Sequence, residues 1–201
     1  MIHRYGEEGF NNDWLELIKH DPIHPKLKLL PRIKGNRTVF VYSHEGIPQF
    51  MVCARIGNKL PHNISEVLSD DGYNSAYDVK YGIFYSIFRL PGATLKGGGK
   101  HAIKELIEYC KIAGLNGFFT LSPIPFLRDT FSNKPNEAMI RNYLESLQGP
   151  VEKFHLGNGA RIQNINFDAD MSSLRYAESW GIMVNYDYNH YQDDDKLDVV
   201  N

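Results

Sequence analysis

The chain has 201 residues, a length that fits one compact domain or one domain with a short extension. Hydrophobic residues make up 42% of it, with 12 Tyr and 11 Phe, so we expect a full core and disorder confined to the ends. The net charge of −2 gives no reason to expect nucleic acid or an anionic membrane as a partner. No apolar run reaches 18 residues and the first residues carry no signal-peptide core, so we expect a soluble, cytoplasmic protein.

Cysteine and histidine usage argues against disulfides and against a metal site. Cys53 and Cys110 lie alone in apolar stretches, and we expect them to be buried thiols of a reducing compartment. The histidines fall at no spacing that is typical of zinc ligands. We therefore expect no bound metal.

The first third of the chain predicts one short helix and a hairpin. Residues 1–36 are expected to form an N-terminal extension with a helix at 10–20, which two prolines end. Runs rich in β-branched and aromatic residues at 37–43 and 49–56 predict two strands, and the turn residues between them predict a hairpin. A helical turn is expected at Ile64–Leu68.

The middle of the chain predicts a βαβ unit. An apolar and aromatic strand at 79–90 leads into a loop at 93–99 that contains three successive glycines. A helix begins near Lys100, with apolar residues recurring at helical spacing from Ile103, and the next strand begins at Phe118. Two strands joined by such a crossover should run parallel.

The last third predicts one further helix and two strands. A helical stripe runs through 140–147 and is expected to stop at Gly149-Pro150. Strands are expected at about 161–167 and 181–188. The acidic tail at 192–201 is expected to be a flexible, solvated end.

The glycine-rich loop suits an anion, because glycines let backbone N–H groups approach it and the helix N-terminus adds positive charge. The loop consists of Thr94, Leu95, Lys96, Gly97, Gly98, Gly99 and Lys100. It is similar to the pyrophosphate-binding loop of Gcn5-related N-acetyltransferases, with Thr94 at the position that usually holds Gln or Arg. A plain flexible loop is the alternative interpretation.

Seven short segments from residue 84 onward are the most informative about function. They are Phe84–Ile87, Pro91–Gly92, Gly99–Lys104, Leu121–Pro125, Phe154–Ala160, Asn166–Ser172 and Gly181–Tyr188. A serine beside two prolines and a histidine before a glycine turn are the parts of a small active site. In this order and spacing, the segments resemble malonyl-CoA decarboxylase.

This resemblance implies a fold and a site. It implies that residues 37–191 form a Gcn5-related N-acetyltransferase-like α/β domain, with a mixed, mostly antiparallel sheet, a splayed parallel pair and flanking helices. The catalytic serine of the family falls on Ser122 and its catalytic histidine on His155. The loop that binds CoA in the family spans Ala93–Lys100.

The sequence departs from the family in the loop, after the serine and at the front. Leu95 and Phe126 replace glycines, and Lys100-His101 replace an Asn or Thr followed by an apolar residue. The family carries a helical domain before the catalytic one that helps to build its tetramer, whereas about 36 residues precede the first predicted strand here. We therefore do not expect the tetramer, and a homodimer stays open.

Decarboxylation of a malonyl thioester releases CO2 and leaves an enolate, so the site needs an orienter for the carboxylate, donors for the oxyanion and an acid for the α-carbon. We expect His155 to donate the proton to C2, because an imidazole titrates near neutrality. Ser122 would hydrogen-bond the departing carboxylate or relay a proton. Tyr186 and Asn158 are second candidates for orienting His155 or the thioester. No cofactor beyond the CoA or phosphopantetheine thioester is expected.

The expected substrates are malonyl-CoA and malonyl-acyl carrier protein, with neither nucleic acid nor a membrane as partner. One alternative is a decarboxylase and S-acetyltransferase that loads acetyl onto an acyl carrier protein in polyketide biosynthesis. Another is a non-catalytic acyl-CoA-binding protein. A Ser–His hydrolase is a weaker rival, since no Gly-x-Ser-x-Gly elbow surrounds Ser122. Without the resemblance, Ser122 reads as a strand-end hydroxyl, His155 as a surface histidine and Tyr186 as a core aromatic.

Overall fold

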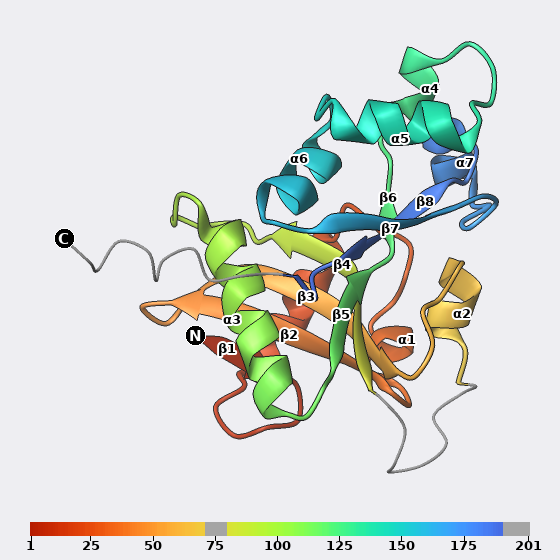
Figure 1. Ribbon diagram of the computed structural model, residues 1–201. Coiled ribbons are helices and arrows are strands. Elements are labelled where there is room, and N and C mark those ends of the chain that lie inside the picture. Colours follow the sequence, from red (N-terminus) through yellow and green to blue (C-terminus); the bar gives the residue numbers. More distant parts are fainter. Residues whose placement is uncertain (71–79, 191–201) are drawn as a thin grey trace.

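In the part of the chain that the structure describes, one mixed sheet of eight strands organises the fold (Figure 1). The computed structural model describes residues 1–70 and 80–190. The strands are β1 Ile2–Arg4, β2 Arg37–His44, β3 Ile47–Gly57, β4 Tyr81–Arg89, β5 Gly117–Thr120, β6 Ser122–Pro123, β7 Arg161–Asn166 and β8 Met183–Asp187. Their order is β1-β2-β3-β4-β5-β8-β6, and β7 also pairs with β8.

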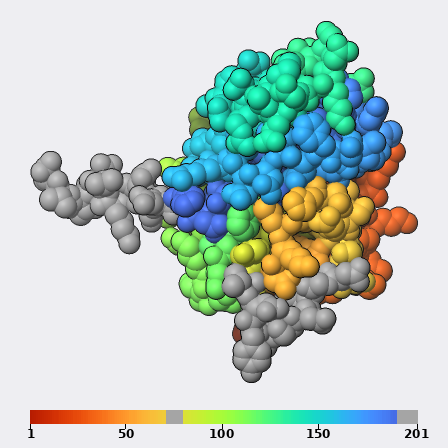
Figure 2. All heavy atoms as spheres, turned by 45° about the vertical axis from the view of Figure 1, so that its right-hand side comes forward, coloured from red at the N-terminus to blue at the C-terminus, as the bar shows by residue number. Residues whose placement is uncertain are grey.

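The helices connect these strands and cover the sheet. They are the 3-10 helix η1 Asn12–His20 and the α-helices α1 Leu30–Ile33, α2 Ile64–Leu68, α3 Gly98–Ile112, α4 Leu127–Thr130, α5 Glu137–Glu145, α6 Pro150–Gly157 and α7 Ser173–Ser179. In the space-filling view, the segments from α4 to β8 gather at one end of the molecule, above the segment that contains α2 (Figure 2). None of the helices in the described ranges is long and apolar enough to cross a bilayer.

The expected βαβ unit is confirmed, with β4, α3 and β5 in succession. Its two strands pair in parallel from Tyr81 opposite Gly117 to Phe84 opposite Thr120. Beyond that point they part, because β4 continues along β3 as far as Arg89 while β6 pairs with β8. The parallel pair is therefore splayed, as expected, and every other pairing in the described sheet is antiparallel.

Alternating side chains of the central strands divide the core between the two faces of the sheet. On β2, Phe40 belongs to the cluster that contains Ile103 of α3, whereas Val39 and Val41 belong to the cluster that contains Ile18 of η1. Helix α5 packs in the first cluster and α2 in the second. The parallel strands β4 and β5 need packing partners on both faces of the sheet, because each strand presents apolar residues to both faces.

The structure differs from the sequence-based expectation at residues 149–150. The pair Gly149-Pro150 does not simply end a helix, because Pro150 is the first residue of α6 and Gly149 is its N-cap. Proline suits this position, since its fixed φ is helical and an N–H group in the first turn of a helix has no acceptor within the helix. His155 therefore lies on a helix and not beside a surface turn.

The first 36 residues also take part in the sheet. Strand β1 pairs antiparallel with β2, with Ile2 opposite Tyr42, a pairing that the composition of this segment did not indicate. The short helix expected at 10–20 is present, but it is of the 3-10 type. The predicted tail at 192–201 lies outside the described residues.

Candidate active site

Ser122 and His155 come from different elements and meet in the interior. Ser122 lies on β6, opposite Val184 of β8, and His155 lies in the last turn of α6. Nε2 of His155 is 3.0 Å from Oγ of Ser122, which is hydrogen-bond distance. Their exposed fractions are 6% for Ser122 and 4% for His155, so the pair is shielded from bulk water.

Two further hydroxyls extend this pair into a chain of hydrogen bonds. The Ser122 hydroxyl donates to Oγ1 of Thr120 at 2.9 Å, and the Tyr188 hydroxyl lies 2.9 Å from Nδ1 of His155. When Ser122 donates to Thr120, its Oγ accepts from Nε2–H of His155, and Nδ1 accepts from Tyr188. This tautomer satisfies both ring nitrogens and leaves the imidazole neutral.

Burial keeps His155 neutral near pH 7. Its ring stacks on Tyr186 with centroids 4.4 Å apart and planes at 23°. Loss of water lowers the pKa of His155 to about 3. The sequence-based reason for making His155 the proton donor, an imidazole that titrates near neutrality, therefore does not hold for the free protein. Burial also raises the pKa of Tyr186, so its phenol stays protonated.

A cavity of about 160 Å³ lies beside the pair, where β4 and the chain leading to β6 part. Its lining residues are Ile23, Phe84, Tyr85, Ser86, Ile87, Ser122, Pro123, Pro150, Val151, Phe154 and His155. The walls are mostly apolar, and the lining residues whose side chains carry a polar group are Tyr85, Ser86, Ser122 and His155. A narrow apolar slot with a few converging polar groups is typical of a site for a small organic ligand.

The glycine-rich loop precedes α3 and is partly occupied by its own contacts. The N–H groups of Thr94 and Leu95 both donate to Oε1 of Gln49, at 2.9 Å each, so they already have an acceptor. Gly97 is the N-cap of α3, with a φ of 68° that favours glycine. The side chains of Lys96 and Lys100 are exposed on either side of it.

Buried Gly98 and Gly99 allow this loop to approach its neighbours. A Cβ atom on Gly98 would lie 3.1 Å from Phe50, and one on Gly99 would lie 2.6 Å from Phe154. Phe154 also lines the cavity, so the loop and the Ser122–His155 pair are connected through one aromatic ring.

Of the predicted site residues, the structure brings Ser122, His155 and Tyr186 together, and it places Asn158 elsewhere. Asn158 is the C-cap of α6, and its backbone N–H donates to the carbonyl oxygen of His155 at 3.2 Å. Within residues 1–70 and 80–190, no hydrogen bond joins its side chain to the His155 ring. The hydrogen-bond partner of Nδ1 of the ring is Tyr188, which the sequence reasoning missed.

Alternation along strands could have identified the missed residues. Tyr188 follows Tyr186 by two positions, and Thr120 precedes Ser122 by two, so each pair should face the same side of an extended chain. Ile23 and Ser86 carry no such signal, because tertiary packing alone brings them to the cavity.

Comparison with known proteins gives a family match for the last third of the chain. Residues 138–196 match the family model for the malonyl-CoA decarboxylase C-terminal domain, which confirms the resemblance seen in the sequence. A search among curated proteins gives no match.

Solved structures give the fold. Malonyl-CoA decarboxylase from Agrobacterium vitis aligns with a TM-score of 0.73 and 24% identity, over 94% of this chain and 60% of its own. The one from Rhodopseudomonas palustris aligns with a TM-score of 0.68 and 23% identity, over 94% and 59%. The GphF GNAT-like decarboxylase, in complex with isobutyryl-CoA, aligns with a TM-score of 0.62 and 16% identity, over 92% and 97%. The expected Gcn5-related N-acetyltransferase-like fold is thereby confirmed. The chain spans about 60% of the length of the two malonyl-CoA decarboxylases that it matches.

Proposed function

Because residues 138–196 match the family model for the malonyl-CoA decarboxylase C-terminal domain, we propose that this chain removes CO2 from a malonyl group carried as a thioester. The observation that carries the proposal is the buried Ser122–His155 pair, 3.0 Å apart, on the wall of a cavity between parting strands. The product is the corresponding acetyl thioester. Malonyl-CoA is the substrate we favour, and malonyl on an acyl carrier protein carries the same reactive group on the same kind of arm.

The cavity has the features that a thioester arm needs. Where β4 and β6 separate, backbone groups are released from the ladder and apolar side chains line a slot. A pantetheine arm entering there would bring the malonyl carbonyl beside Ser122 and His155. Exclusion of water strengthens every electrostatic contact with the enolate that forms.

The proton for C2 is proposed to come from His155 after substrate has bound. In the free protein burial holds the pKa of His155 at about 3, but the negative carboxylate of a malonyl group placed beside the ring favours the charged imidazole and raises this pKa. As the bond between C2 and the carboxyl carbon breaks, its electron pair forms the enolate and CO2 leaves. The imidazolium then protonates C2 and returns to the neutral form, so the net reaction consumes one proton from water.

The hydroxyls around His155 would act with it. In the free protein the Ser122 hydroxyl donates to Thr120 at 2.9 Å. When substrate is bound, the same hydroxyl can rotate and donate to the carboxylate or to the enolate oxygen instead. Tyr188 holds Nδ1 and thereby fixes the ring so that Nε2 is directed at Ser122. Tyr186 contributes a ring face that keeps the imidazole in place.

The glycine-rich loop is proposed to hold the phosphates of CoA with fewer backbone donors than the sequence suggested. Because Gln49 occupies the N–H groups of Thr94 and Leu95, we assign the contact to Lys96, Lys100 and the N-terminus of α3 around Gly97, Gly98 and Gly99. Lysine ammonium groups and a helix N-terminus both attract phosphate.

Incubation of the full chain with malonyl-CoA, with and without a malonyl-loaded acyl carrier protein, tests the proposal. We expect acetyl-CoA and CO2, and a loss of turnover of about 100-fold or more in His155→Gln with acyl-CoA binding retained. The matched control is Lys153→Ala, an exposed residue of the same helix, which should keep wild-type rates. Acetyl appearing on the carrier would add a transfer step to the reaction. Tight acyl-CoA binding without release of CO2 would favour a binding protein and overturn the proposal.

A further inference from the structure

A second cavity lies next to the candidate active site and is separated from it at one residue. This cavity has a volume of about 280 Å³ and is formed by the segment at 23–27 together with residues of α2 and α7 and the turn before α7. Ile23 is the residue that lines both this cavity and the cavity beside Ser122 and His155. The wall between the two spaces is therefore thin at this point.

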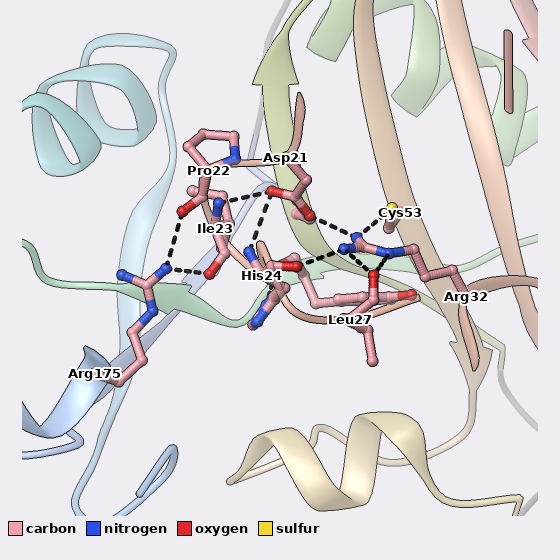
Figure 3. Close-up of polar contacts among 10 residues, drawn as sticks. Asp21, Pro22, Ile23, His24, Leu27, Arg32, Cys53 and Arg175 are labelled. Atoms are coloured by element: carbon pink, nitrogen blue, oxygen red, sulfur yellow. Dashed lines mark hydrogen bonds and ion pairs between the residues drawn. The ribbon is translucent and has the colours of Figure 1, made fainter. Parts of the chain in front are cut away.

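The backbone of Ile23 is fixed from both sides (Figure 3). Its N–H donates to Oδ1 of Asp21 at 2.7 Å, and its carbonyl oxygen accepts from Nη2 of Arg175 on α7. The neighbouring carbonyl of Pro22 accepts from the same guanidinium nitrogen at 3.5 Å. Arg175 is 3% exposed, so this contact is shielded from water.

Asp21, which accepts from the Ile23 N–H, is itself buried and held by two hydrogen bonds. Its Oδ2 accepts from Nη1 of Arg32 at 2.5 Å and from the Ser86 hydroxyl at 2.8 Å, and neither Asp21 nor Arg32 exposes its side chain. Arg32 also donates to the carbonyl oxygens of His24 and Leu27. Figure 3 shows this segment held between Arg32 on one side and Arg175 on the other. A wall held in this way cannot move aside at low cost to admit a larger ligand.

We propose that Ile23 is a specificity-determining residue that limits the acyl group of the substrate, a role that rests on the proposed decarboxylation. With Ile23 in place, the acyl end of the thioester is confined to the cavity of about 160 Å³. A malonyl group is small enough for this space, whereas a malonyl group with a butyl chain on C2 needs room beyond the wall. Removing most of the Ile23 side chain joins the first cavity to the second, which has apolar residues such as Ile64 and Leu68 in its lining.

The test compares Ile23→Ala with Leu27→Ala. Leu27 lines the second cavity and not the first, so its truncation enlarges that space without opening the wall. Binding of acetyl-CoA and hexanoyl-CoA is measured by calorimetry, and turnover is measured with malonyl-CoA and butylmalonyl-CoA, whose decarboxylation product is hexanoyl-CoA. We expect Ile23→Ala to favour hexanoyl-CoA over acetyl-CoA by about 10-fold or more relative to wild type, since each methylene that finds an apolar place changes discrimination by roughly 10-fold. The ratio for Leu27→Ala should stay within about twofold of wild type.

The two readouts separate this role from the proposed reaction. Equal changes for both ligands in Ile23→Ala, or an equal preference for hexanoyl-CoA in Leu27→Ala, would overturn the role of Ile23. If wild type releases no CO2 but Ile23→Ala still shifts the binding ratio, the decarboxylation is wrong and the size limit stands. Should Ile23→Ala fail to fold, Ile23→Val, which removes a single methyl group, is expected to shift the ratio in the same direction by a smaller factor, and an unchanged ratio would count against the role.

Discussion

Gly99, in the first turn of α3, lies so close to Phe154 of α6 that a Cβ atom on Gly99 would be 2.6 Å from Cε2 of the ring. Real Cβ atoms essentially never lie within 3.0 Å of such an atom, so the two helices can adopt this spacing because residue 99 has no side chain. The same ring lines the cavity beside His155. The shape of the wall of this cavity therefore depends on a glycine of the predicted phosphate-binding loop.

Replacement of Gly99 by alanine should push the Phe154 ring toward the cavity. We expect a several-fold weaker binding of acyl-CoA and a lower free energy of unfolding, because overpacking costs about 1–3 kcal/mol while alanine returns up to about 1 kcal/mol of helix propensity. Calorimetric binding and urea unfolding measure the two effects. Gly157→Ala is the matched control on α6, since a Cβ there meets nothing within 4 Å. Acyl-CoA affinity unchanged in both variants would contradict the link between loop and cavity.

Tyr186 in β8 and Tyr188 directly after it should respond differently to loss of their hydroxyl groups. Tyr188→Phe leaves Nδ1 of His155 without its partner at 2.9 Å, at a cost of about 1–3 kcal/mol, so we expect kcat to fall by about 10-fold to 100-fold. Tyr186→Phe keeps the stacked ring and removes a buried hydroxyl that has no hydrogen-bond partner among the described residues. That variant should retain its turnover and unfold at the same or a higher urea concentration. A comparable loss of kcat in both variants would mean that Nδ1 does not depend on Tyr188.

The sequence predicted the fold and the meeting of Ser122 with His155 better than it predicted the surroundings of these two residues. The βαβ unit followed from local periodicity, and Ser122 and His155 followed from the resemblance. The helical setting of His155 was missed because Gly149-Pro150 reads equally well as the end of one helix and the start of the next. The low pKa of His155 was also out of reach, since it comes from burial and not from a neighbour in sequence. The place of Ile23 depends on buried polar contacts with Asp21 and with Arg175, which lies in the last third of the chain.

Burial of neutral His155 should make the protein less stable in acid. The folded-state pKa is about 3 and the unfolded value is about 6.5, so the unfolded chain binds the extra proton between these pH values. The free energy of unfolding is therefore unaffected by the titration of this histidine above about pH 6.5, and it decreases progressively as the pH falls toward the folded-state pKa. By pH 5 the loss should be about 2 kcal/mol, from roughly 1.4 kcal/mol per pH unit.

Urea unfolding of wild type and His155→Gln at pH 7 and pH 5 measures this loss. We expect wild type to lose about 2 kcal/mol more than the variant over this interval. Burial also lowers the pKa of His24, but that histidine is present in both proteins and cancels in the comparison. Parallel losses in the two proteins would show that His155 titrates normally in the folded state.

Breaking the buried pair Asp21–Arg32 should lower the free energy of unfolding strongly, whereas replacing both residues together should lower it much less. Both side chains are fully buried, with Nη1 and Oδ2 2.5 Å apart, so removing either charge leaves the other unpaired in the interior. Asp21→Asn is expected to lower the free energy of unfolding by about 3–5 kcal/mol, whereas the double variant Asp21→Asn with Arg32→Met should recover much of that loss. The exposed pair Lys134–Asp168 is the control, and its disruption should cost less than about 1 kcal/mol. If Asp21→Asn lowers the free energy of unfolding as little as Asp168→Asn does, Asp21 does not hold the backbone of Ile23 rigidly. The limit that Ile23 sets on acyl-group size would then have to depend on the contact with Arg175 alone.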